Sequence, residues 1–114
     1  MDEAKRQALA LAKARLDLSE LYARPVSLRG VRIWVVPWLF RAPWFRRFDG
    51  YSAWWTILLR SRSFLADEEL VAHELCHVWQ MQHRPLAMPL SYLYRGYADN
   101  PYEREARDAA ARKP

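Results

Sequence analysis

The sequence predicts an α+β domain, because an N-terminal helical segment, a strand-rich middle and two further helices follow one another along the chain. The chain has 114 residues, of which 52% are hydrophobic. That length supports one hydrophobic core, so residues 1–114 are predicted to form a single domain. We expect a small sheet that packs against a central apolar helix.

The first half of the chain contains one predicted helix and the predicted strands. Residues 3–22 carry apolar side chains at helical spacing, and Pro25 ends that segment. Residues 26–36 are rich in β-branched side chains that alternate with polar ones, which predicts strands. Residues 37–50 contain two prolines and an Asp-Gly pair and are predicted to be a loop. Residues 51–59 predict one further strand.

The second half contains the two remaining helices. Asp67 is a suitable N-cap, two glutamates follow it in the first turn, and the helix is expected to run to about His83. Residues 86–98 are apolar and rich in tyrosine, and we expect a loop and a short helix there. Asn100-Pro101 opens the last predicted helix, which covers Tyr102 to about Arg112.

Composition excludes several classes of protein. The formal net charge is +5, the chain has a single cysteine, and no apolar run reaches the roughly 18 residues that span a membrane. One cysteine excludes an internal disulfide. The first 20 residues are charged and lack an apolar signal core, so we expect no signal peptide and a cytoplasmic location. A basic balance alone does not indicate nucleic acid, since no motif of a nucleic-acid-binding fold is present.

The most informative motif is His73-Glu74-Leu75-Cys76-His77, an HExxH pattern on the second predicted helix. Residues four apart on a helix differ by about 40° around the axis and by about 6 Å along it, so both imidazoles project from one face. They are therefore predicted to bind one zinc ion, while Glu74 lies at the edge of that face, where it can act as a general base.

An alternative explanation is two surface histidines that have no metal. The helix around the motif is apolar on most of its circumference, and two histidines and a glutamate are costly to bury there without a metal or partners. The metal site is therefore the better interpretation. Cys76 lies about 100° from His77 on the helix and is predicted to be a buried hydrophobic residue rather than a ligand.

A zinc site needs a third protein ligand, and two main candidates compete. His83 extends the motif to HExxHxxQxxH, but Gln80 stands where a bend would be needed to bring His83 back to the ion. Glu103, one turn into the last helix, can face the HExxH helix. The alternative explanation for Glu103 is an approximate capping box with Asn100, which requires no metal. We favour Glu103 over His83; Glu105 and Asp99 are weaker alternatives.

The segments HELCHVWQ and NPYEREA together resemble the gluzincin clan of zinc metallopeptidases, and in particular the small minigluzincins. The resemblance covers roughly residues 51–112. It implies a minimal zincin-like fold, in which an edge strand borders the cleft, an active-site helix carries HExxH and a C-terminal helix supplies Glu103 as the third ligand. The sequence has Arg107 where thermolysin-like relatives have an aspartate that orients a zinc histidine, and Asp108 follows one step later.

The function that follows is hydrolysis of a peptide or protein substrate with one Zn²⁺ ion, in which Glu74 activates a zinc-bound water. Tyr97 and Tyr102 are candidates for a group that stabilises the transition state. The strand over residues 52–59 is a candidate for pairing with extended substrate backbone. The compact members of the family lack much of the far wall of the cleft, so the resemblance also implies weak or latent activity.

A second interpretation is a non-catalytic zinc-binding protein. Residues 38–48 combine five aromatic side chains with arginines, and such a loop can contact a membrane surface, single-stranded nucleic acid, another protein or the cleft itself. For about half of these rings, burial in the core of a small domain is the simpler explanation.

Overall fold

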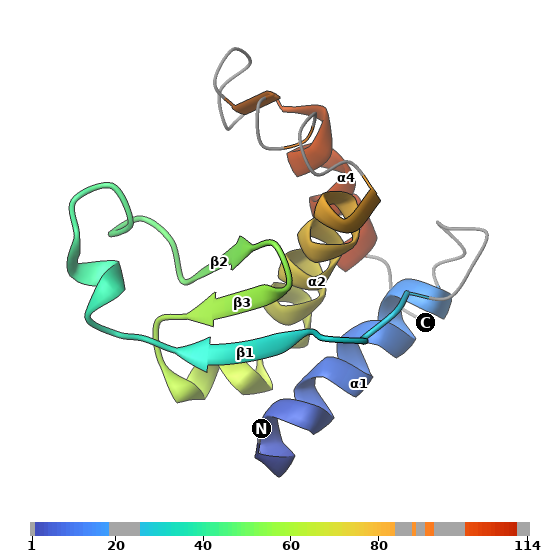
Figure 1. Ribbon diagram of the computed structural model, residues 1–114, viewed down its shortest axis with the longest axis horizontal. Helices are drawn as coiled ribbons and strands as arrows, with labels where there is room; N and C mark the ends of the chain where they lie inside the picture. Colours follow the sequence, from blue (N-terminus) through green and yellow to red (C-terminus); the bar gives the residue numbers. More distant parts are fainter. Residues whose placement is uncertain (1, 19–25, 84–87, 89–90, 93–99, 112–114) are drawn as a thin grey trace.

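The computed structural model describes residues 2–18, 26–83, 88, 91–92 and 100–111, and these form one α+β arrangement (Figure 1). Among these residues the sheet lies at one side of the molecule and the helices at the other. The long helices are α1 (Glu3–Leu18), α2 (Glu68–His83) and α4 (Pro101–Ala111), the strands are β1 (Arg32–Val35), β2 (Gly50–Ala53) and β3 (Thr56–Leu59), and two 3-10 helices cover Leu39–Arg41 and Arg62–Ala66. The expected α+β class is confirmed.

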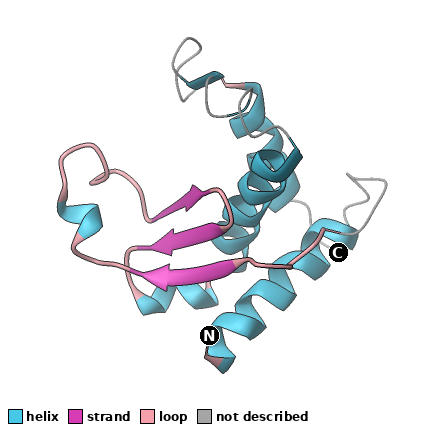
Figure 2. Cartoon of the chain, viewed as in Figure 1, coloured by secondary structure: helices cyan, strands magenta, loops and turns pink. Residues whose placement is uncertain are grey.

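The sheet has the strand order β1-β3-β2, as Figure 2 illustrates. Strand β3 is central, parallel to β1 and antiparallel to β2. Side chains alternate between the two faces of a strand, and the inward ones, Ile33, Ile57 and Leu59, are fully buried. Because β2 pairs only with β3, it is an edge strand of the described sheet.

The prediction of one strand over residues 51–59 was wrong. This segment is a hairpin in which a turn at Trp54–Trp55 separates β2 from β3. Trp54 has a φ of 52°, in the left-handed region that tight hairpin turns use. Glycine or asparagine usually occupies such a position, so the two adjacent tryptophans gave no turn signal.

Helix α2 is the centre of the molecule and packs against α1, α4, β2 and β3. Its buried Val71, Leu75 and Val78 join Leu9 and Leu16 of α1 in one core. Helix α4 contributes Ala106, Ala109 and Ala110, whose exposed fractions are 1% or less. Because these side chains are small, α4 lies close to α2.

Both helices that carry predicted ligands begin at the expected caps. The Asp67 carboxylate accepts a hydrogen bond from the backbone N–H of Leu70 at 3.0 Å, and the Asn100 side chain accepts one from the N–H of Tyr102 at 2.9 Å. These bonds fix where α2 and α4 start, and with it the rotation of each helix. Helix α1 is described as far as Leu18. A loop and a short helix were expected over residues 86–98, and most of this segment lies outside the described residues. Within it, Met88, Ser91 and Tyr92 are helical.

None of the helices in the described part of the chain is long and apolar enough to cross a membrane.

Candidate metal centre

Helix α2 directs His73 and His77 toward one point. Their Nε2 atoms lie 3.2 Å apart, and their rings meet edge to face with centroids separated by 4.8 Å. The side chain of His77 is 8% exposed and that of His73 is 16% exposed, so His73 is the more open of the two. The one-turn spacing of the motif therefore produces a pair of imidazoles that face each other.

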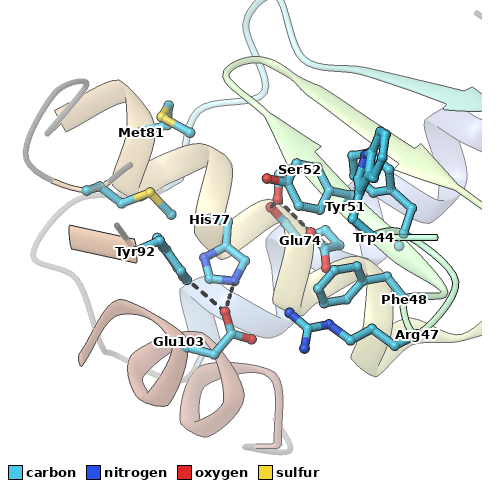
Figure 3. A pocket seen from close by; sticks show the side chains of 13 residues that line it. Trp44, Arg47, Phe48, Tyr51, Ser52, Glu74, His77, Met81, Tyr92 and Glu103 are labelled. Atoms are coloured by element: carbon cyan, nitrogen blue, oxygen red, sulfur yellow. Dashed lines mark hydrogen bonds and ion pairs between the residues drawn. The ribbon is translucent and has the colours of Figure 1, made fainter. Parts of the chain in front are cut away.

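Helix α4 brings the carboxylate of Glu103 to the same point. Its Oε1 lies 2.7 Å from Nε2 of His73, and its Oε2 lies 2.9 Å from Nε2 of His77. The Tyr92 hydroxyl donates a hydrogen bond to Oε2 at 3.0 Å, as Figure 3 shows. The Glu103 side chain is 1% exposed and points at the histidines, so the helix cap is formed by Asn100 without it.

The three side chains fit a metal ion. Their donor atoms all lie within 4.8 Å of one another, and the set of two imidazoles and one carboxylate is typical of catalytic zinc sites. Oε1 of Glu103 is buried at ion-pair distance from His73 but has no hydrogen-bond partner among the described residues. A cation between the three donors would satisfy this oxygen.

The other candidate ligands lie apart from this cluster. His83 contacts the carbonyl oxygen of Trp79 through its Nδ1 at 2.9 Å, and its ring stacks on the Trp79 indole with centroids 4.2 Å apart. Cys76 is fully buried in the core, as expected. Glu105 is not part of the cluster, and Asp99 lies outside the described residues.

Burial and mutual contact set the charges of the cluster. Burial raises the pKa of Glu103, but its contacts with His73 and His77 outweigh this effect and hold the pKa well below its usual range. Burial lowers the pKa of His77, but the contact with Glu103 and the negative charges of Glu74 and Glu103 outweigh it, so the pKa is raised. The carboxylate of Glu103 is therefore ionised at neutral pH.

Gln80 orients the His77 ring. The backbone carbonyl of Tyr102 accepts a hydrogen bond from Nε2 of Gln80 at 2.9 Å, which leaves Oε1 of Gln80 facing Nδ1 of His77 at 2.8 Å. Because an amide oxygen can only accept, Nδ1 carries a proton in either charge state of the ring, so Nε2 is the nitrogen that would bind a metal ion. Gln80 would thus orient a metal-binding histidine, which an aspartate does in thermolysin-like relatives at the position of Arg107. The HExxH pattern alone does not indicate this contact.

Replacing Gln80 by methionine is expected to weaken metal binding about 10- to 100-fold, because the volume is kept but the acceptor for the Nδ1 proton of His77 is lost. Titration with Zn²⁺ against a chromophoric chelator measures the change. Gln82→Met, on the same helix, is the control and should bind as the wild type does. Unchanged binding in Gln80→Met would contradict this role.

Glu74 lies beside the cluster and is 5% exposed. The Ser52 hydroxyl, on edge strand β2, donates a hydrogen bond to Oε2 of Glu74 at 2.5 Å. Gly50 leaves room for this side chain, since a Cβ at that position would lie 3.3 Å from Cγ of Glu74. The hairpin therefore places a hydrogen-bond donor and a residue without a side chain against Glu74.

Two cavities meet at Glu74. One, of about 480 Å³, is bordered by His77, Tyr92 and Glu103 and has aromatic side chains opposite them. The other, of about 360 Å³, is bordered by His73 and by charged side chains, among them Asp67, Glu69 and Arg107. The cluster is thus accessible from an aromatic side and from a charged side.

The aromatic loop over residues 38–48 divides between core and cleft. Phe40 is buried, and Trp38 is 68% exposed. Trp44, Phe45, Arg47 and Phe48 border the larger cavity. Part of the loop therefore forms the wall of the cleft opposite helix α2.

Among the described residues, Tyr92 reaches the cluster, and it was not one of the tyrosines predicted from the sequence. Of the two tyrosines proposed there, Tyr97 lies outside the described residues, and Tyr102 borders neither of the two cavities. The fold brings Tyr92, 11 positions before Glu103, to its carboxylate, whereas the prediction for Tyr97 is not tested.

Comparison with protein-family models, with curated proteins and with solved structures finds no match for this chain.

Proposed function

We propose that this protein is a zinc-dependent peptidase with a minimal zincin-like fold, in which His73, His77 and Glu103 hold the ion and Glu74 is the general base. The observation that carries the proposal is the position of a carboxylate, Glu74, at the junction of two cavities and beside a buried set of two imidazoles and a carboxylate. The HExxH pattern and the downstream glutamate agree with the gluzincin resemblance.

Zinc is the ion that this donor set favours. Imidazole suits zinc and other first-row metals, while Mg²⁺ and Ca²⁺ prefer sites made of oxygen atoms alone. When bound, a zinc ion supplies Lewis acidity that polarises a carbonyl and lowers the pKa of water toward about 7. His73, His77 and Glu103 would hold the ion and would leave it accessible to substrate or water from the two cavities.

The side chains around the cluster have distinct roles in hydrolysis. Glu74 accepts a proton from the attacking water and returns it to the leaving nitrogen, and Ser52 holds its carboxylate in place. Tyr92 orients the Glu103 carboxylate through its hydroxyl. Strand β2 pairs only with β3 among the described strands, so its other edge is suited to an extended substrate backbone.

The proposal is tested by zinc analysis together with hydrolysis of a quenched fluorescent peptide library. We expect one zinc per chain, hydrolysis that a chelator abolishes, and recovery when zinc is added back. Stoichiometric zinc with no hydrolysis of any library member would instead favour a non-catalytic or latent zinc protein, and absence of zinc would reject both.

Ser52→Ala is expected to lower kcat roughly 10- to 100-fold, because it removes a hydrogen bond to a charged catalytic group. KM and zinc content should change little, since Ser52 does not contact the cluster. Steady-state kinetics on one library substrate give both parameters. Ser63→Ala removes an exposed hydroxyl from a 3-10 helix and serves as the control. A kcat equal to that of Ser63→Ala would remove Ser52 from the mechanism.

A further inference from the structure

The positive charge of the protein is concentrated on the sheet side. Residues 26–62 contain seven arginines and one acidic residue, Asp49, which gives this segment a formal charge of +6. The rest of the chain therefore carries a formal charge of −1, since the total is +5. Asp49 pairs with Arg60 at 3.4 Å and Arg62 pairs with Asp2 at 2.9 Å. The remaining five arginines, all exposed, are Arg29, Arg32, Arg41, Arg46 and Arg47.

The same segment exposes most of the tryptophans. Five of the six tryptophans of the chain lie within residues 26–62, and their exposed fractions range from 47% to 71%. They are Trp34, Trp38, Trp44, Trp54 and Trp55. Exposing this many large indoles is unfavourable in water unless they contact a partner.

Strand pairing places several of these side chains on the outer face of the sheet. Trp34 is opposite Leu58, which is opposite Tyr51, and the three form one row across the sheet. Arg32 lies two residues before Trp34 and therefore shares its face. The inward face carries the buried core residues, so Arg32 and Trp34 face away from the helices, while Tyr51 on the edge strand also borders the larger cavity.

We infer that this surface, defined as the outer sheet face with Trp34 and Tyr51, the Trp54–Trp55 turn and the arginine-rich loop with Trp38 and Trp44, docks onto an anionic phospholipid bilayer. Indole rings are favoured at the boundary between headgroups and acyl chains because they combine an apolar body with one N–H donor. Exposed arginines beside them bind lipid phosphates, and the charge of +6 complements an anionic leaflet.

The composition favours lipid over nucleic acid. The segment contains no asparagine or glutamine, the side chains that read adenine by paired hydrogen bonds. Its indoles belong to β1, to the loop after it and to the hairpin turn, at both ends of the sheet. Such a broad apolar array suits a planar interface better than a groove that follows one strand.

Docking in this way also has a consequence for the cleft. Trp44 and Tyr51 border the larger cavity beside Glu74, so the mouth of that cavity would lie next to the bilayer. The docking itself does not depend on peptidase activity, and it can be measured without a substrate.

The experiment is co-sedimentation of the full chain with vesicles, combined with its tryptophan fluorescence. We expect binding to vesicles of phosphatidylserine and phosphatidylcholine in equal amounts, with a blue shift of the emission, and little binding to phosphatidylcholine alone. Raising the salt to about 1 M, where the Debye length is about 3 Å, should release most of the protein.

Two pairs of substitutions locate the surface. Arg29→Gln with Arg32→Gln should lower the partition coefficient roughly 30-fold, whereas Arg6→Gln with Arg104→Gln, which removes the same charge from helices α1 and α4, should lower it less than about threefold. Trp34→Ala with Trp38→Ala should lower it roughly tenfold or more, whereas Leu11→Ala, at an exposed apolar position of α1, should not.

Three results would overturn the inference. The first is no binding of the wild type to the anionic vesicles. The second is an equal loss of binding in the sheet variants and in their helix controls. The third is binding to a thymidine oligonucleotide at the same ionic strength without binding to vesicles, which would assign the surface to nucleic acid.

Discussion

Replacing Glu74 by glutamine is expected to lower kcat for peptide hydrolysis by a factor of about 10² to 10⁴ and to leave one zinc per chain. The amide keeps the size of the side chain and can still accept the hydrogen bond from Ser52, so the fold is retained. It cannot take a proton from water. Zinc content is unaffected because Glu74 is not one of the three converging donors.

The measurement is the initial rate on one library substrate, together with zinc content from the same preparation. Glu68→Gln is the matched control, because it removes a carboxylate from the first turn of the same helix and borders neither cavity. A Glu74→Gln protein that retains wild-type kcat would exclude the proposed base.

Replacing Glu103 by glutamine is expected to weaken zinc binding at least about 100-fold. The charged donor of the cluster is lost, while the volume and an acceptor for the Tyr92 hydroxyl are kept. Zinc stabilises the folded chain by mass action, by about 4 kcal/mol at a free concentration 1,000 times its Kd. For a chain of this length, we therefore expect zinc to raise the wild-type Tm by about 15 °C.

Thermal unfolding with and without zinc tests this prediction. At the zinc concentration that gives the full wild-type increase, Glu103→Gln should show at most about a third of it. Glu105→Gln, two residues further along the same helix, should behave like the wild type. An increase that survives in Glu103→Gln and disappears in a His83→Ala protein would place the metal elsewhere.

Features that depend on local geometry were predictable from the sequence. Two histidines one turn apart on a helix share a face whatever surrounds them, so the pairing of His73 with His77 follows from their spacing. The caps at Asp67 and Asn100 are also local, and they fix where both ligand-bearing helices begin. The position of Glu103 one turn into the last helix made it the favoured third ligand, although the same position also fitted a capping box with Asn100.

Features that depend on tertiary contacts were not predictable. Gln80 appears in the motif as a residue that lets the helix continue, and its contact with His77 becomes evident only when α4 supplies the carbonyl of Tyr102. Tyr92 reaches Glu103 from a segment without a strong local pattern. The Trp54–Trp55 turn was missed because a tryptophan occupies the left-handed position.

The central claim is that His73, His77 and Glu103 bind one metal ion. A crystal structure of the zinc-loaded protein, with anomalous scattering recorded at the zinc edge, tests it most directly. We expect one anomalous peak at about 2.0–2.1 Å from Nε2 of both histidines and at about 2.0–2.2 Å from a carboxylate oxygen of Glu103. A peak at His83 instead, or no peak between α2 and α4, would contradict the claim.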